Sequence, residues 1–307
     1  KITNEFQNSS GVDGDWNIAP PGSLHVEDLE IKGVQLGMPE ILVKDTLEKA
    51  GFEQDQLYQF SKEIRLIDGV EKEITRSDRK GISAESLGPL VKKYVITIQT
   101  VEPSMDLLSE LDEPPLRGMI AQARKTLGSL PLYLVYHIEY TQSFGSDTKH
   151  DISALKNQIG KFFGNPTYQP TSIHRRLGSA YGTDENNWLI YHDATHVPVV
   201  HREHILSQVK GKSDEAAMLK KAFQHPCGAR ERVSCVNAGL IGAFPDSLEL
   251  RLEAARIIYS PVMMVHFQGS KITTLLEWAY IKSEKSIREY FAKTKAQADK
   301  PTATLDF

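Results

Sequence analysis

The clearest pattern of hydrophobic and polar positions lies between Ile31 and Phe52. A short apolar strand is followed by Pro39, whose fixed φ and missing N–H suit the start of a helix. Apolar residues then recur at helical spacing on one face, and Gly51 follows as a typical stop signal. The pattern therefore predicts a strand that leads directly into a helix over residues 39–50. The strand residues are Ile31, Val34 and Leu36, and the helical face consists of Val43, Leu47 and Ala50.

A similar helix is predicted in the middle of the chain, over residues 151–163. Asp151 is a suitable N-cap, one apolar stripe follows, and Gly164 with Pro166 ends the helix. Because the two helices end in similar chemistry, we expect two related modules. The stripe consists of Ile152, Leu155, Ile159 and Phe162.

Alternating residues predict several antiparallel strands. Asp68-Gly69 lies between two such runs and is a strong signal for a hairpin. In the run 132–144 the even-numbered apolar residues share one face, and His137 is expected on the opposite, wetter face. Further strands are predicted over 63–67, 70–75, 90–101, 188–192, 248–252, 262–267 and 272–281, with helices over 119–127, 213–223 and 284–296 and an exposed connector over 102–115.

A helix followed by antiparallel strands, twice, predicts an α+β fold. The βαβ rhythm of a parallel sheet is missing from the pattern. We therefore expect two related modules, each with short helices packed on an antiparallel sheet. The expected divisions are a flexible segment over 1–24, a first module over 25–146, a second module over 147–296 and a tail over 297–307.

The segment Gly-Val-Gln-Leu-Gly-Met-Pro over 33–39, with its helix and Gly51, resembles the entry motif of certain exported bacterial modules. These are modules of the β-lactamase-inhibitor-protein type, which are similar to small outer-membrane assembly lipoproteins. The resemblance covers the 31–52 stretch and extends in part to residues 151–166. It implies two short helices on an antiparallel sheet whose open face holds another protein, and thus a binding scaffold without a catalytic site.

Composition and charge narrow the class of protein. The 307 residues are 40% hydrophobic and 25% charged, which is ordinary for a globular chain with a core. The net charge of −4 gives no reason to expect nucleic acid or an anionic membrane as a partner. No apolar run approaches the roughly 18 residues of a membrane span. Because the chain starts at Lys1 without Met, we expect that a signal peptide has been removed and that the protein is periplasmic or extracellular.

Four histidines within thirteen residues form the main candidate for catalytic chemistry. Imidazoles are the commonest metal ligands, and zinc is the metal that suits them best. A loop over this segment would bring the histidines together beside Asp193 or Glu203. Such a site would be that of a metal-dependent hydrolase. The alternative is a polar loop between a strand and a helix, because the x2 spacing of the last two differs from His-Glu-x-x-His. The histidines are His192, His196, His201 and His204.

Aromatic side chains offer a second candidate, a contact surface for a partner. Tyrosine and tryptophan are enriched at protein interfaces, although core packing explains such residues equally well. The candidates are Tyr133, Tyr191, Trp188 and Trp278. Since the chain lacks a Gly-x-Ser-x-Gly motif and a complete phosphate-binding loop, we expect a non-enzymatic protein-binding module of the inhibitor, immunity or envelope-assembly type, without a cofactor. A small-ligand carrier, with its ligand between the sheets, is the other alternative.

The two cysteines, Cys227 and Cys235, flank a polar, turn-like segment and are predicted to form a disulfide. Two buried thiols in a cytosolic protein are the alternative. The unreduced, denatured protein should therefore resist alkylation by iodoacetamide, and reduction should restore reaction at both positions. Peptide mass spectrometry checks this result, and alkylation of both thiols before reduction would contradict it.

Overall fold

The computed structural model describes twelve stretches of the chain. They are 14–16, 25–58, 62–67, 70–75, 80–86, 91–144, 152–163, 168–170, 188–193, 197–209, 213–224 and 247–298.

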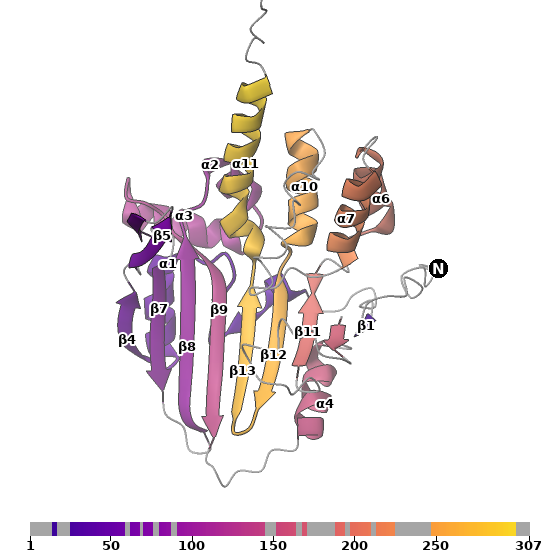
Figure 1. Ribbon diagram of the computed structural model, residues 1–307. Coiled ribbons are helices and arrows are strands. Elements are labelled where there is room, and N and C mark those ends of the chain that lie inside the picture. The colour runs from indigo at the N-terminus through magenta and orange to yellow at the C-terminus, as the bar shows by residue number, and fades with distance from the viewer. Residues whose placement is uncertain are drawn as a thin grey trace, which may run out of the picture.

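A nine-stranded antiparallel sheet forms the centre of the molecule (Figure 1). Together with the helices it places the protein in the α+β class, as the sequence predicted. In spatial order the strands are β1 (Gly14–Trp16), β10 (Tyr168–Pro170), β11 (Trp188–His192), β12 (Val262–Gln268), β13 (Lys271–Glu277), β9 (Leu134–Phe144), β8 (Val91–Val101), β7 (Lys80–Ser86) and β4 (Glu53–Tyr58).

Two hairpins stand beside the central sheet. The first joins β2 (Glu30–Ile31) to β3 (Val34–Gln35), and the second joins β5 (Lys62–Ile67) to β6 (Val70–Thr75). The β5–β6 pairing confirms the hairpin predicted around Asp68-Gly69.

The two predicted modules contribute strands to one sheet. Strand β9 from the first half pairs with β13 from the second half over seven residue pairs, from Lys271 opposite Ser143 to Glu277 opposite His137. The sequence left open whether the two halves of the chain share one sheet. The β9–β13 ladder shows that they do. That the two halves are related to one another stays a prediction.

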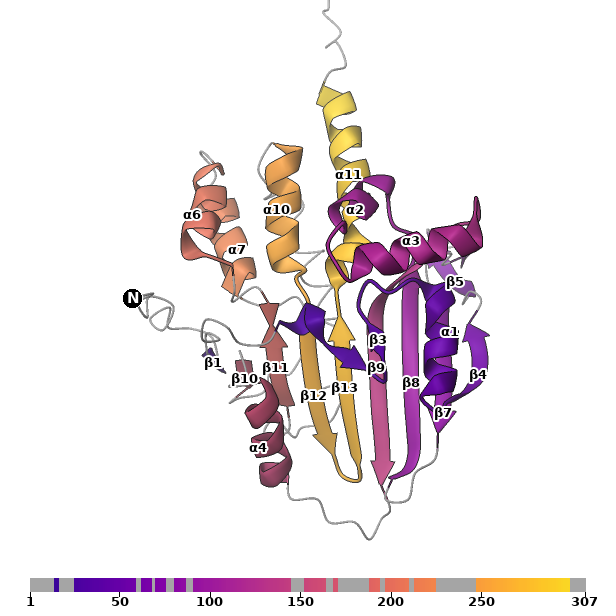
Figure 2. The ribbon, with the colours of Figure 1, turned by 180° about the vertical axis from the view of Figure 1, so that it is seen from behind.

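Helix α1 (Glu40–Lys49) covers one face of the sheet, together with the β2–β3 hairpin and α4 (Ile152–Phe163), as Figure 2 shows. Pro39 is the N-cap of α1, and Gly51 follows the helix with a φ of 81°, as predicted for a glycine stop. Val43 and Leu47 are buried in the core beneath the helix. The strands contribute Ile96, Ile98, Val135, Ile138, Tyr140, Leu189, Tyr191, Met263, Val265, Phe267, Ile272 and Leu276 to this core.

The other described helices gather at one end of the sheet, above the strands from β8 to β11 in Figure 1. They bury a second core that includes Leu134 and Tyr136 at the end of β9. These helices are α2 (Met105–Glu110), α3 (Leu116–Leu127), α6 (Val199–Ser207), α7 (Ser213–Gln224), α10 (Leu248–Ile258) and α11 (Ala279–Ala298).

The strand predicted over residues 248–252 is wrong, because this segment begins helix α10. Alternating leucines suggested a half-buried strand, but Leu252 is buried at helical spacing from Ala255. Arg251, expected to face water, is also buried and lies over the Phe291 ring at 5.0 Å from its centroid. Packing on α11 thus overrides the local alternation.

Two further boundaries differ from the prediction. The connector over 102–115 contains α2, because the Ser104 side chain accepts a hydrogen bond from the Leu107 amide and caps the helix. The strand predicted to end at residue 281 ends at Glu277, and α11 already begins at Ala279.

The expectation that His137 faces water is also wrong, because its exposed fraction is 7%. A bulge in β9 lies directly before His137 and leaves it on the side of the sheet opposite Ile138. Gln99 of β8 is opposite His137 and Thr100 is opposite Val135, so one extra residue, Tyr136, lies between them. The bulge moves Val135 into the core under α1, while Tyr136 packs in the core at the end of the sheet.

Asp193, directly after β11, connects the sheet to the 3₁₀ turn η2 (Val26–Asp28). Its carboxylate accepts hydrogen bonds from the amides of Val26 at 2.7 Å and Glu27 at 3.1 Å. The side chain is 8% exposed, and burial raises its pKa to about 6, although both amide bonds oppose this shift. Burial therefore disfavours the charged carboxylate relative to its protonated form.

Replacement of Asp193 by Asn should remove a pH dependence of folding. Because the folded-state pKa is raised, the group binds its proton more tightly in the folded protein. Its contribution to stability is present below about pH 4 and is lost as pH rises to about 6. This loss amounts to about 3 kcal/mol between pH 4 and 7.

Urea unfolding of both proteins at several pH values measures this effect. Between pH 4 and 7, the free energy of unfolding of the wild type should fall by about 3 kcal/mol relative to that of Asp193→Asn. Asp45→Asn, which alters an exposed carboxyl of α1, is the matched control. A pH-independent difference between wild type and Asp193→Asn would contradict the prediction.

Candidate functional site

Polar side chains line the side of the sheet opposite α1. The central strands alternate, so residues between the core positions of β8, β9 and β13 point to this second side. No described helix lies over these three strands on this side in Figure 1. We call this surface the polar face, and its polar residues are Thr97, Gln99, His137, Glu139, Thr141, Thr273 and Glu277. Two apolar residues, Val95 and the buried Leu275, lie on the same side.

The strand register arranges the polar face in rows. In the first row Gln99, His137 and Glu277 lie opposite one another across the three strands. In the second row Thr97 lies opposite Glu139. Side chains opposite one another in a sheet are close enough to interact. Leu275 lies opposite Glu139 on β13, so the second row combines hydrogen-bonding groups with a buried apolar side chain.

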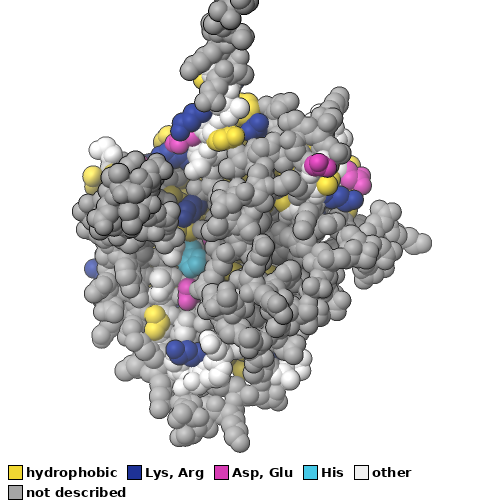
Figure 3. All heavy atoms as spheres, in the orientation of Figure 1, with side chains coloured by type: hydrophobic (Ala, Val, Ile, Leu, Met, Phe, Trp, Pro, Cys, Tyr) yellow, Lys and Arg dark blue, Asp and Glu magenta, His cyan; other side chains and the backbone are white. Residues whose placement is uncertain are grey.

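Several contacts hold this array in place. The His137 Nε2 atom lies 3.9 Å from Glu139 Oε2, and the Tyr136 hydroxyl donates to Gln99 Oε1 at 2.6 Å. The hydroxyls of Thr141 and Thr273 are 3.0 Å apart. Figure 3 shows a histidine beside an acidic side chain on this side of the molecule.

Burial varies strongly across the polar face. Glu277 is 0% exposed, whereas 36% of the Glu139 side chain is exposed. Lys282, at the start of α11, places its ammonium 5.3 Å from the centroid of the Tyr136 ring. Buried ionisable groups are costly and often mark functional sites. The partly exposed polar groups of the face are Thr97, Gln99, Glu139, Thr141 and Thr273.

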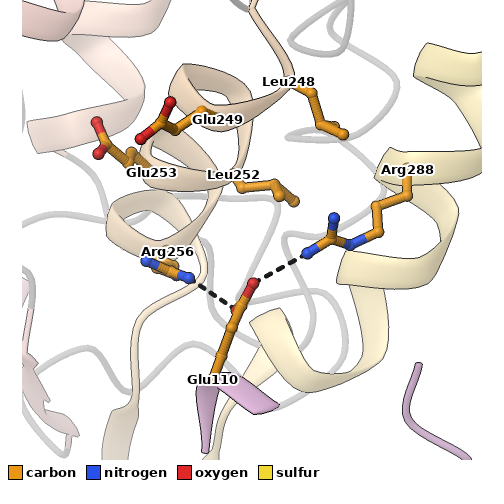
Figure 4. A pocket seen from close by; sticks show the side chains of 7 residues that line it. All are labelled: Glu110, Leu248, Glu249, Leu252, Glu253, Arg256 and Arg288. Atoms are coloured by element: carbon orange, nitrogen blue, oxygen red, sulfur yellow. Dashed lines mark hydrogen bonds and ion pairs between the residues drawn. The ribbon is translucent and has the colours of Figure 1, made fainter. Parts of the chain in front are cut away.

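A second candidate is the pocket between α2, α10 and α11 (Figure 4), which we call the Glu110 pocket. Its volume is about 440 Å³. Glu110 accepts from Arg256 Nη2 at 2.8 Å and from Arg288 Nη2 at 2.9 Å. The lining residues are Glu110, Leu248, Glu249, Leu252, Glu253, Arg256 and Arg288.

The hydroxyl of Tyr280 donates a third bond to Glu110 at 3.1 Å. Burial raises the pKa of this hydroxyl, so it remains a donor. Burial by itself lowers the pKa of Arg256, but its bonds to Glu110 and Tyr280 raise it above the ordinary value. The guanidinium of Arg256 thus stays charged beside its carboxylate partner.

Arg288 is also held from the other side. Its Nε donates to Glu284, which is fully buried, and its Nη1 lies 3.2 Å from Asp106. Glu284 accepts a further bond from the Ser104 hydroxyl at 2.7 Å. These contacts tie α2 to α11 and fix the base of the pocket.

The predicted metal ligands are only partly described. His201 and His204 lie on α6, which begins after its N-cap Pro198, so this segment is a helix and not the expected loop. His201 Nε2 lies 4.0 Å from Glu253. His192 ends β11, but its side chain and all of His196 lie outside the described residues. Asp193 is engaged with η2, and Glu203 is exposed on α6.

Within the described stretches, no group of three or more His, Cys, Asp or Glu side chains is placed to hold a metal ion. The predicted zinc site over 192–204 stays a prediction. Cys227 and Cys235 also lie outside the described residues, so their disulfide stays a prediction as well.

The predicted aromatic contact residues do not lie on one described surface. Tyr191 is buried in the core under α1, and Tyr133 and Trp278 are partly buried. Trp278 packs against both cores, and the side chain of Trp188 lies outside the described residues. Tyr191 is therefore a core residue and not part of a contact surface.

Sequence reasoning missed the polar face and the Glu110 pocket. The sequence does contain a signal for the polar face. Polar residues alternate with apolar ones at His137, Glu139 and Thr141 in one strand, and polar residues recur at Thr273 and Glu277 in another. The pairing of β9 with β13, which brings these residues together, requires the tertiary structure. For the pocket no local signal exists, because Glu110 and Arg288 are far apart in the chain.

Comparisons with known proteins returned no match to a family model, to a curated protein or to a solved structure. Among the described helices, none is long and apolar enough to cross a membrane.

Replacement of Glu110 by Gln should destabilise the junction of α2, α10 and α11. The substitution leaves two arginines without their shared carboxylate, but partial exposure screens the loss, so we expect about 1–2 kcal/mol. Urea unfolding measures the change. Glu113→Gln, an exposed position near α2, provides the matched control and should change stability by less than about 0.5 kcal/mol. Equal stabilities of the two variants would contradict a role of Glu110 as the central acceptor.

Proposed function

We propose that this chain is a non-enzymatic protein-binding module that holds its partner against the polar face. The observation that carries this proposal is the asymmetry of the sheet around β8, β9 and β13. One side of these strands packs against α1 and the β2–β3 hairpin. On the other side no described helix lies over the strands, and the partly exposed polar side chains are Thr97, Gln99, Glu139, Thr141 and Thr273, whereas His137 and Glu277 are buried. An exported inhibitor, immunity factor or envelope-assembly factor is the class of protein that this arrangement suits.

The chemistry of the polar face supports binding to a folded surface. Thr97, Thr141 and Thr273 are β-branched, so they lose little side-chain freedom when a partner covers them. Glu139 supplies a charged acceptor whose side chain is 36% exposed. Short, ordered polar groups provide specificity through hydrogen bonds, which an interface of standard size needs in addition to its buried area.

The position of these strands supports the same conclusion. β8, β9 and β13 are interior strands of the sheet, paired on both sides. Their backbone groups are therefore engaged in the ladder, and recognition must use the side chains of the face and not strand addition at an edge. A partner would meet a rigid surface that needs little reorganisation on binding.

Site-specific photo-crosslinking tests the proposal. Benzoylphenylalanine at position 97 or 273 places a reactive group on the polar face, and the same residue at 44 or 48 places it on the exposed side of α1. In an envelope extract of the source organism, positions 97 and 273 should give one discrete protein adduct. An excess of unlabelled wild-type protein should suppress that adduct.

A double variant provides the matched control for this experiment. Glu139→Ala combined with Thr141→Ala alters the face without touching the core, so an excess of this protein should compete poorly. Alanine at Lys44 and Glu48, on the exposed side of α1, should leave competition unchanged. Adducts of equal yield from both sides of the sheet, or none from positions 97 and 273, would refute binding at the polar face.

A further inference from the structure

His137 has two glutamates as neighbours on the polar face. On its own strand, its Nε2 atom lies 3.9 Å from Glu139 Oε2. On the neighbouring strand β13, Glu277 lies directly opposite His137. The Trp278 amide donates to the Tyr136 carbonyl at 2.8 Å. His137 and Glu277 therefore form the adjacent, non-hydrogen-bonded pair of the ladder, in which opposite side chains come closest.

The other described groups that face His137 carry no negative charge. Strand β8 contributes the amide of Gln99, whose Oε1 accepts from the Tyr136 hydroxyl. Beyond β13, strand β12 contributes the apolar Val262. From α11, Lys282 places its ammonium 5.3 Å from the centroid of the Tyr136 ring, which itself lies 6.3 Å from the imidazole centroid. The charges described around the imidazole are therefore two carboxylates and one more distant ammonium.

This environment favours the protonated form of His137. Imidazole is the side chain whose ordinary charge change falls between about pH 5 and 8, and a neighbouring carboxylate favours its charged form. Burial opposes the charge, since the His137 side chain is only 9% exposed. The two carboxylates offset that cost, because both ring nitrogens of the charged imidazole donate hydrogen bonds. We therefore expect His137 to take up a proton between about pH 8 and 5.

Protonation of His137 would change how Glu139 is presented to a partner. Glu139 is the partly exposed carboxylate of the polar face, whereas Glu277 is fully buried. The distance of 3.9 Å between Nε2 and Glu139 Oε2 is longer than a hydrogen bond. A proton on Nε2 would add a charge-assisted hydrogen bond to this contact and draw the carboxylate toward the imidazole. The charge of Glu139 would then be compensated within the face.

We propose that His137 makes binding at the polar face dependent on pH. At neutral pH, Glu139 accepts a basic side chain, lysine or arginine, from the partner. At lower pH, the protonated imidazole competes for the same carboxylate, and the partner is released. A basic partner surface fits this face, because both acidic residues of the face lie beside one imidazole. This inference rests on the proposed function, since it concerns the same surface.

Photo-crosslinking at two pH values tests the proposal. With benzoylphenylalanine at position 273, the adduct in the envelope extract should be about tenfold weaker at about pH 5.5 than at about pH 7.5. In His137→Gln the ratio of the two yields should fall to about one, because glutamine gains no proton. Equal wild-type yields at both pH values, or an unchanged ratio in His137→Gln, would overturn the proposal.

His201→Gln is the matched control for this variant. His201 lies on α6, away from the polar face, and has a similar contact with a carboxylate, at 4.0 Å from Glu253. Its replacement should leave the ratio of the two yields at about ten, as in the wild type. Loss of the ratio in His201→Gln as well would contradict a specific role of His137. Unfolding curves establish that each variant is folded.

NMR spectra of the imidazole nitrogens in the free, full chain separate this inference from the proposed function. The His137 signals should change from the neutral to the protonated form between about pH 8 and 5. In Glu139→Gln the midpoint of this change should be lower by about 1 pH unit, because a carboxylate is removed. An imidazole that stays neutral throughout, or an unchanged midpoint, would overturn the inference even where a partner binds. Normal titration without any adduct would refute the proposed function and, with it, this inference.

Discussion

The antiparallel ladder between β9 and β13 is the interaction on which the rest of the structure depends. It joins strands from the two halves of the chain, and β9 contributes to both hydrophobic cores. The bulge at Tyr136 makes this double role possible, because it changes which side chains of β9 face α1. A slip of this ladder by one residue would exchange core and polar positions across the sheet. The register is therefore strongly specified.

Buried polar groups connect these cores to the rest of the molecule. Asp193 holds η2 through two backbone amides, and Glu284 holds both Ser104 and Arg288. Each burial costs free energy that its hydrogen bonds offset only in one geometry. Such groups consequently add more to the uniqueness of the arrangement than to its net stability. They explain how short elements such as η2 and α2 keep defined positions.

The polar face and the Glu110 pocket use this rigidity in different ways. The face presents ordered side chains of interior strands, whose backbone is already engaged in the ladder. In the pocket, ion pairs fix the base and leave mixed charges at the rim. In the function proposed above, the partly exposed hydrogen-bonding groups of the polar face would contact a macromolecular surface.

The sequence by itself determined the local elements with strong periodicity or turn chemistry. Pro39 and Gly51 delimit α1, and Asp68-Gly69 identifies the β5–β6 hairpin, because backbone restrictions act within a few residues. Only the tertiary structure decided the helix at Leu248, the burial of His137 and the convergence of Glu110 with Arg288. These features depend on strand pairing and on contacts between distant segments. Local patterns do not encode them, because burial and charge pairing are properties of the packed chain.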